Sequence, residues 1–141
     1  MKRYANTALI YAILAMVGGV FYREFTKFNA FTGQTALSVV HTHYFLLGMV
    51  VFLLLVVLEK VLSFTGTKTG RVLLVYHIGL NLMVLMLLVR GVAQVLALPL
   101  SSGMDAAISG MAGIGHILLG VSLVLLLLQI KRAAASCCVK A

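Results

Sequence analysis

Acidic residues are scarce in this chain of 141 residues, which has three of them against eleven lysines and arginines. Glu24, Glu59 and Asp105 all fall at the edges of apolar stretches, so no carboxylate is placed to serve a proton relay inside a membrane. Cysteine is limited to Cys137 and Cys138 near the C-terminus, where further ligands for a metal site are lacking. The chain also lacks a Ser-His-acid set and an HExxH motif, which excludes the conventional hydrolases that depend on them.

Apolar side chains are abundant instead. Hydrophobic residues make up 62% of the chain and charged residues 10%, and the mean hydropathy is +1.13. A helix needs roughly 20 mostly apolar residues to cross a bilayer, where every backbone polar group must be paired within the segment. Four stretches qualify, at about 5–22, 37–58, 72–89 and 107–130. We therefore predict an all-α integral membrane protein with one domain, an antiparallel up-down-up-down four-helix bundle, followed by a tail at 131–141.

The basic residues are placed as membrane topology requires. Although the net charge is +8, these residues sit at the ends of the apolar stretches, which argues against a nucleic-acid partner. The positive-inside rule predicts a multi-pass protein of the cell (inner) membrane with both termini cytoplasmic. The first stretch lacks a cleavage site and is predicted to be retained. The predicted cytoplasmic set is Lys2, Arg3, Lys60, Lys68, Arg71, Lys131, Arg132 and Lys140, and the outer set is Arg23, Lys27 and Arg90.

Four histidines, His41, His43, His77 and His116, lie inside the predicted spans. Ionisable side chains are costly in a membrane and generally mark a partner, a cavity or a cofactor. His41 and His43 are two residues apart, which is about 200° around an α-helix, so they face one point only if the helix start is irregular. This spacing disfavours a single zinc ion bound by both.

The surroundings of the histidines favour a flat ligand. His116 shares its helix face with small residues only, and such a flat face suits the edge of a porphyrin better than a compact metal cage. Gly48, seven residues after His41, offers similar clearance, and Asn81, one turn after His77, is placed to orient a ligand. The small residues beside His116 are Ser109, Ala112, Gly113 and Gly120.

Depth within the membrane suggests how the histidines pair. Helical rise puts His116 roughly 13 Å below the outer boundary, with His41 and His43 roughly 6 and 9 Å below it. Haem b, in one or two copies, then has His116 and either His41 or His43 as its axial pair. His77, roughly 18 Å down, would serve a second haem or a quinone or gas pocket. Arg23, Lys27 and Arg90 are the candidate partners of the haem propionates.

The segments "ALSVVHTHYFLLGM", "YHIGLNLMVLMLLVRG" and "ISGMAGIGHILLG" together resemble a bacterial family of small four-helix integral membrane proteins of unknown function. This resemblance covers nearly the whole chain and implies the fold only. The H-x-H pair is also similar to a helix of haem-copper oxidases and nitric oxide reductases, where the two histidines serve different haems from opposite faces. From that likeness, a role as haem ligands would apply only to His41 and His43. The chain is far shorter than the catalytic subunit of those oxidases and lacks the copper site with its crosslinked tyrosine.

Three functions remain open from the sequence. The first is a membrane b-type cytochrome that exchanges electrons with quinones or binds a diatomic gas, which leaves open whether it is a haem-dependent oxidoreductase. The second is a copper or zinc binding or transport protein that combines histidines with thioether ligands. The third is a non-catalytic structural or assembly subunit, working as a homo-oligomer or beside a redox partner. The methionines available to the second are Met49, Met83, Met86 and Met111.

Overall fold

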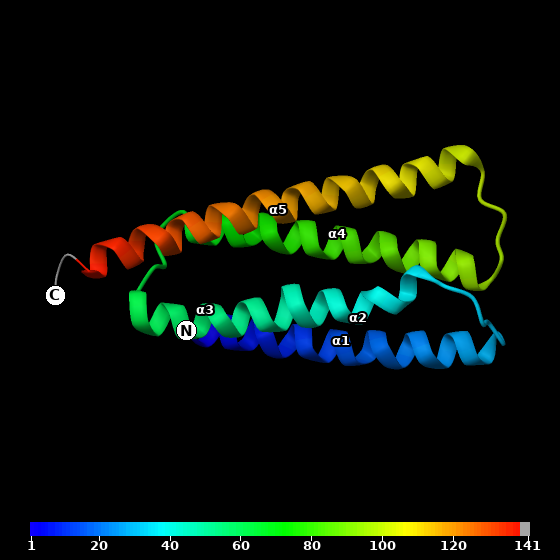
Figure 1. Cartoon of the computed structure of the whole chain (residues 1–141), viewed down its shortest axis with the longest axis horizontal. Coiled ribbons are helices and arrows are strands. Elements are labelled where there is room, and N and C mark those ends of the chain that lie inside the picture. Colours follow the sequence, from blue (N-terminus) through cyan, green and yellow to red (C-terminus); the bar gives the residue numbers. More distant parts are fainter. Residues whose placement is uncertain (139–141) are drawn as a thin grey trace.

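The computed structural model describes residues 1–138, with side chains described as far as Ser136. Four helical segments run back and forth along one long axis: α1 (Lys2–Phe28), a composite segment over residues 36–62, α4 (Thr69–Val95) and α5 (Ser102–Cys138) (Figure 1). All four are long and apolar enough to cross a membrane, and the described residues contain no strand. The predicted all-α, four-helix membrane architecture is therefore confirmed.

Each helix extends beyond its predicted span. α4 continues past Arg90 to Val95, and α5 continues as helix into the predicted tail. The side chains of Cys137 and Cys138, and residues 139–141 with Lys140, lie outside the described residues. The start of α1 and the last turns of α5 lie at the same end of the bundle, here called the terminal end (Figure 1).

The second span has an irregular start. It consists of η1 (Ala36–Val39), a 3₁₀ turn, then α2 (Val40–His43), then η2 (Tyr44–Val50), a π-helical stretch, and finally α3 (Val51–Leu62). The widened π turn places the Leu47 carbonyl within reach of the Tyr76 hydroxyl, which donates to it at 2.7 Å. π-helical turns occur frequently at functional sites, and this one directly follows the H-x-H pair.

The helices pack as two pairs, α1 with the composite segment and α4 with α5. The α4–α5 contact is the most extensive in the molecule. It is made close by Gly79 and Gly115: a Cβ at Gly79 would lie 2.6 Å from the Leu119 nitrogen, and one at Gly115 would lie 2.8 Å from the Met83 nitrogen. Small residues allow this backbone approach in a membrane, where packing rather than hydrophobicity holds helices together.

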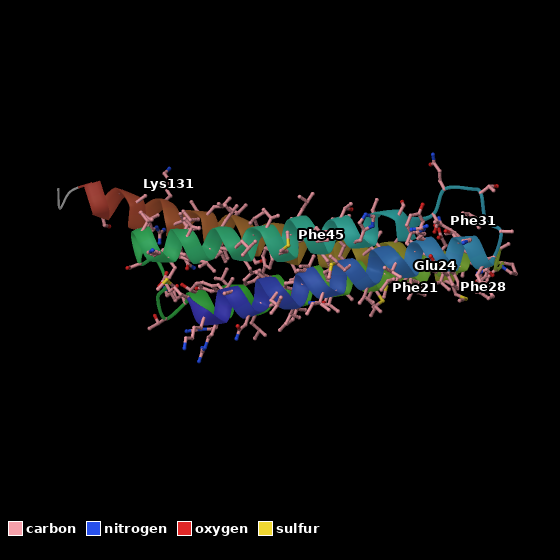
Figure 2. The ribbon with its side chains drawn as sticks, turned by 90° about the horizontal axis from the view of Figure 1, so that it is seen from below. Phe21, Glu24, Phe28, Phe31, Phe45 and Lys131 are labelled. Atoms are coloured by element: carbon pink, nitrogen blue, oxygen red, sulfur yellow. The ribbon has the colours of Figure 1, made fainter. Side chains whose placement is uncertain are left out.

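Aromatic side chains fill the space between the two pairs. Phe52 of α3 is 1% exposed and stacks on His77 of α4, with ring centroids 5.0 Å apart. Tyr11 and Tyr76 pack against Phe52 from α1 and α4. On the outside, large apolar side chains are widely exposed, as expected for surfaces that face lipid. Phe21 and Phe28 are among these exposed side chains and are labelled in Figure 2.

In the view of Figure 2, which is turned by 90° from that of Figure 1, α5 lies behind α2 and α3, and α4 lies behind α1. α5 runs obliquely, so at the end away from the termini its ribbon stands apart from α2 in Figure 1. There Arg90 of α4 holds the first turns of α5: its Nη2 donates to the Asp105 carboxylate at 2.6 Å and to Ser109 Oγ at 2.7 Å.

Candidate functional site

His43 and His116 share one local arrangement. In each, Nδ1 lies next to the backbone carbonyl one turn earlier, at 2.6 Å from Val39 O for His43 and at 2.9 Å from Ala112 O for His116. A carbonyl oxygen can only accept, so Nδ1 must carry the hydrogen. In the neutral imidazole this leaves the lone pair on Nε2, which is the form that binds a metal.

A residue next to each of these two histidines contacts α4. The Tyr44 hydroxyl donates to Asn81 Oδ1 at 3.0 Å, and Gly115 packs against Met83. Asn81 and Met83 are two residues apart, which is about 3 Å along a helix axis. The residues next to His43 and His116 therefore contact positions of α4 that are less than one turn apart.

The surroundings of these two imidazoles are open. A Cβ added at Gly113 or Gly120 would meet no atom within 4 Å, so the predicted small face of His116 is unfilled within this chain. Beside His43 a groove of about 210 Å³ is lined by Thr42, Leu46 and Leu47. Both rings are on the outer part of the bundle, so a ligand held there would have one edge in lipid.

His41 has different surroundings from His43. Its ring packs against α1, where a Cβ at Gly19 would lie 3.7 Å from the imidazole, and its backbone lies close to Gly18. His41 Nδ1 is buried and has no hydrogen-bond partner among the described residues. The H-x-H pair therefore diverges, as two positions about 200° apart on a helix must.

Gly48 does not provide open space beside His41. A Cβ there would lie 2.5 Å from Tyr11 Cγ, because the tyrosine ring of α1 occupies that position. Among the predicted propionate partners, Arg90 is already bound to Asp105, while Arg23 is exposed and 3.8 Å from Glu24. Lys27 lies in the last turn of α1.

His77 belongs to a polar cluster inside the membrane span, together with Tyr11, Tyr44 and Asn81. Its Nδ1 lies 2.6 Å from the Tyr11 hydroxyl, which also accepts from Asn81 Nδ2 at 3.1 Å. Asn81 Oδ1 in turn accepts from Tyr44. Sequence reasoning identified His77 and Asn81 but missed both tyrosines, because a tyrosine in an apolar helix gives no periodic signal of its own.

The cluster determines which His77 nitrogen is protonated. Tyr11 uses its oxygen to accept from Asn81, and the described contacts offer its own proton no acceptor except His77 Nδ1. The hydroxyl therefore donates to Nδ1, which leaves the hydrogen on Nε2. His77 thus presents an N–H donor on the ring edge opposite Tyr11.

A cleft of about 600 Å³ leads from the terminal end to His77 between α1 and α4. Lys2 and Arg3 line its mouth, while Phe52, Leu73 and Leu74 line its apolar part. The remaining lining residues are Met1, Tyr4, Thr7, Glu59, Thr65 and Gly70. An elongated, mostly apolar molecule with a hydrogen-bond acceptor matches this lining.

The predicted methionine ligands are dispersed. Met83 is fully buried against the α5 backbone at Gly115, whereas Met111 is 44% exposed. Within the part of the chain that the structure describes, no three histidine, cysteine, aspartate or glutamate side chains lie together so that they could hold a metal ion.

Comparison with known proteins gives a family and no activity. Neither a curated protein nor a solved structure matches the chain. One family model matches residues 1–133, so the chain belongs to the family described as "Protein of unknown function (DUF2871)".

Proposed function

We propose that this chain is a membrane-embedded b-type haem protein whose axial ligands are His43 and His116. The observation that carries the proposal is their shared arrangement: each Nδ1 is bound by a backbone carbonyl one turn earlier, and neither Nε2 has a hydrogen-bond partner among the described residues. Binding Nδ1 to a backbone carbonyl fixes the tautomer and raises the basicity of the other nitrogen, as in known metal-ligating histidines.

The donor set fits haem better than a bare ion. Haem brings four nitrogen ligands of its own and needs one or two from the protein, whereas copper or zinc needs a cage of several side chains. The open space beside Gly113 and Gly120 supports a flat group against α5. Arg90 contacts Ser109, two turns from His116, but its guanidinium is already paired with Asp105, so this proposal assigns it no propionate.

Two axial histidines favour electron transfer over gas binding. Bound haem supplies one-electron chemistry, and with both axial positions filled by imidazoles no position is left for a diatomic ligand. The chain's part is to hold the group at a fixed depth and to keep its surroundings apolar. The H-x-H likeness to haem-copper oxidases extends, in this proposal, to His43 only.

A quinone is the redox partner that the His77 cleft supports. The Nε2–H of His77 can donate to a quinone carbonyl, and the Phe52 ring stacked on His77 gives the inner end of the cleft an aromatic wall. Leu74 lines the cleft and is 60% exposed, so an isoprenoid tail could leave between α1 and α4 into lipid. Tyr11 acts as a positioning residue, because it holds the His77 tautomer.

The absorption spectrum of the purified protein tests the haem proposal. We expect a Soret band and, after reduction by dithionite, the sharp visible bands of a six-coordinate b-type haem. Incubation of protein made without haem with added haemin should produce the same spectrum at one haem per chain. If the protein shows no haem spectrum after haemin has been added and unbound haemin removed, this function is excluded.

A second experiment tests the proposed quinone site at His77. Anaerobic menadiol or decyl-ubiquinol should reduce the haem of the wild-type protein, and His77→Phe should slow that step about tenfold, the effect of one lost hydrogen bond. The oxidised spectrum of His77→Phe should not change, because this histidine is not an axial ligand. Tyr11→Phe serves as the matched control and should slow the step less, since it leaves Nε2 in place. Equal rates for wild type and His77→Phe would contradict the quinone site.

We further propose that the terminal end faces the cytoplasm of a bacterial cell. The basic residues at that end, which include Lys2, Arg3, Lys68 and Arg132, outnumber those at the opposite end. An excess of lysine and arginine on short segments marks the cytoplasmic side of a bacterial inner membrane.

A further inference from the structure

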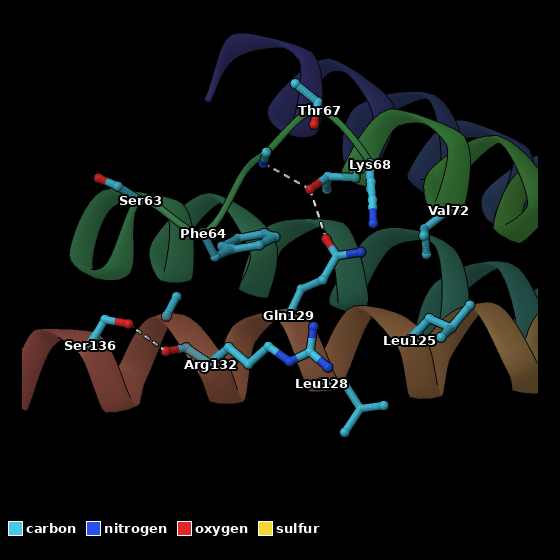
Figure 3. Close-up of a pocket in the computed structure, with 13 residues that line it drawn as sticks. Ser63, Phe64, Thr67, Lys68, Val72, Leu125, Leu128, Gln129, Arg132 and Ser136 are labelled. Carbon is cyan, nitrogen blue, oxygen red and sulfur yellow. Dashed lines mark hydrogen bonds between the residues drawn. The ribbon is translucent and has the colours of Figure 1, made fainter.

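A second cleft lies at the terminal end on α5, distinct from the His43, His77 and His116 sites. It has a volume of about 590 Å³ and lies between the α3–α4 connection, residues 63–68, and the last turns of α5 (Figure 3). Its side chains fall into two groups. The rim is polar, with Lys68, Gln129 and Arg132, whereas the wall farther from the terminal end is apolar, with Val72, Leu125 and Leu128.

The charge of this cleft has one sign. Lys68 and Arg132 both line it, and no acidic side chain does. The ion pairs among the described residues involve Arg23 and Arg90, so neither Lys68 nor Arg132 is neutralised within this part of the chain. Two unneutralised cations at one cleft attract an anion.

Hydrogen bonding turns a third donor toward the same place. Thr69 Oγ1 donates to Gln129 Oε1 at 2.7 Å and accepts from the Gly66 nitrogen at 2.9 Å. With its oxygen occupied, Gln129 presents its NH₂ group to the cleft, beside the Lys68 side chain in Figure 3. The rim therefore offers an ammonium, a guanidinium and an amide NH₂, all of them donors.

The apolar wall distinguishes a lipid from a free anion. Leu125 and Leu128 are 45% and 43% exposed, and they continue from the rim along the lipid-facing side of α5. A phosphate group at the rim would leave attached acyl chains lying along these leucines. Inorganic phosphate would use the rim alone.

We propose that this cleft binds an anionic phospholipid. The headgroup phosphate lies between Lys68 and Arg132 with the Gln129 amide donating to it, and an acyl chain lies against Val72, Leu125 and Leu128. Basic clefts at the cytoplasmic edge of transmembrane helices recognise anionic headgroups in this way. The proposal does not depend on haem.

Native mass spectrometry of the full chain in detergent tests the proposal, with phosphatidylglycerol and phosphatidylcholine of the same acyl composition as probes. The wild-type protein should retain phosphatidylglycerol in preference to phosphatidylcholine. A cation that contacts an anionic headgroup is taken as worth about fivefold in affinity, so the Lys68→Gln, Arg132→Gln double variant should bind phosphatidylglycerol about 30-fold more weakly.

Lys131→Gln is the matched control, because Lys131 is next to Arg132, is exposed, and does not line the cleft (Figure 2). It should change binding less than about twofold, because an exposed charge that does not contact the headgroup is screened by solvent. An equal loss per charge in Lys131→Gln would mean general surface attraction and would overturn the site, as would an unchanged double variant. Displacement of phosphatidylglycerol by an equal concentration of inorganic phosphate would overturn the lipid assignment in favour of a free anion.

One measurement needs no substitution and so avoids any effect on folding. Phosphatidylglycerol with a photoactivatable acyl chain should crosslink to the wild-type chain at the cleft wall, around residues 72 and 125–128. Crosslinks confined to other surfaces would overturn the proposal.

Discussion

His43→Ala and His116→Ala are each expected to remove the six-coordinate spectrum of the reconstituted protein. Each substitution removes an Nε2 that is the proposed iron ligand. In each histidine the backbone carbonyl bound to Nδ1 leaves the lone pair on Nε2. Loss of groups that merely orient a metal ligand costs about 10- to 100-fold in affinity, so loss of the ligand itself should weaken haem binding by more than about 100-fold. Haemin titration followed by absorbance, with electron paramagnetic resonance for the spin state, measures both effects.

His41→Ala is the control that separates the two histidines of the H-x-H pair. Because its ring packs against Gly19 of α1, we expect its removal to leave the spectrum unchanged. Added imidazole should restore a six-coordinate spectrum to His116→Ala by occupying the vacated position. If His41→Ala loses the spectrum and His43→Ala keeps it, the axial pair is the alternative one, His41 with His116.

Gly79→Ala is expected to destabilise the protein strongly, because the added methyl group falls in the α4–α5 contact. The added Cβ would lie 2.6 Å from the Leu119 nitrogen and 2.9 Å from the Gly115 oxygen. Both are backbone atoms of a helix and cannot rotate aside, so α4 and α5 must separate. Overpacking of this kind costs typically 1–3 kcal/mol, and we expect about 3 kcal/mol here.

Gly110→Ala, in the same helix pair, is expected to raise stability rather than lower it. No atom lies within 4 Å of its added Cβ, and alanine favours a helix over glycine by about 0.5–1 kcal/mol. Reversible unfolding in mixed detergent micelles should show Gly79→Ala unfolding earlier and Gly110→Ala no earlier than the wild-type protein. Equal destabilisation by both would mean that the α4–α5 contact at Gly79 is not as close as described.

The features that could be predicted from the sequence follow from the chemistry and geometry of single helices. Four apolar stretches must form helices, because a bilayer leaves no other partner for backbone N–H and C=O groups. The i, i+2 spacing of His41 and His43 required them to diverge in any regular helix. Helix ends were predicted short by several residues, since polar residues such as Thr69 and Gln94 continue a helix beyond the apolar part that hydropathy detects.

Contacts between distant segments could not be predicted from the sequence. Gly48 was expected to leave space near His41, yet it receives Tyr11, 37 residues earlier in the chain. Arg90 was expected to be available for an anionic group, yet it binds Asp105. In both cases the local pattern showed that a small or charged residue was present, but not what would lie against it.

The sequence by itself determined the class of protein, the number of spans and the presence of histidines at membrane depth, because these follow from hydropathy and helical geometry along one segment. Only the tertiary structure decided which histidine nitrogens are free, that Tyr11 and Tyr44 join His77 and Asn81, and that Lys68 and Arg132 share one cleft. Those features depend on the register between helices. Register is set by the close approach of glycines and aromatic rings from different segments, and no single segment contains that information.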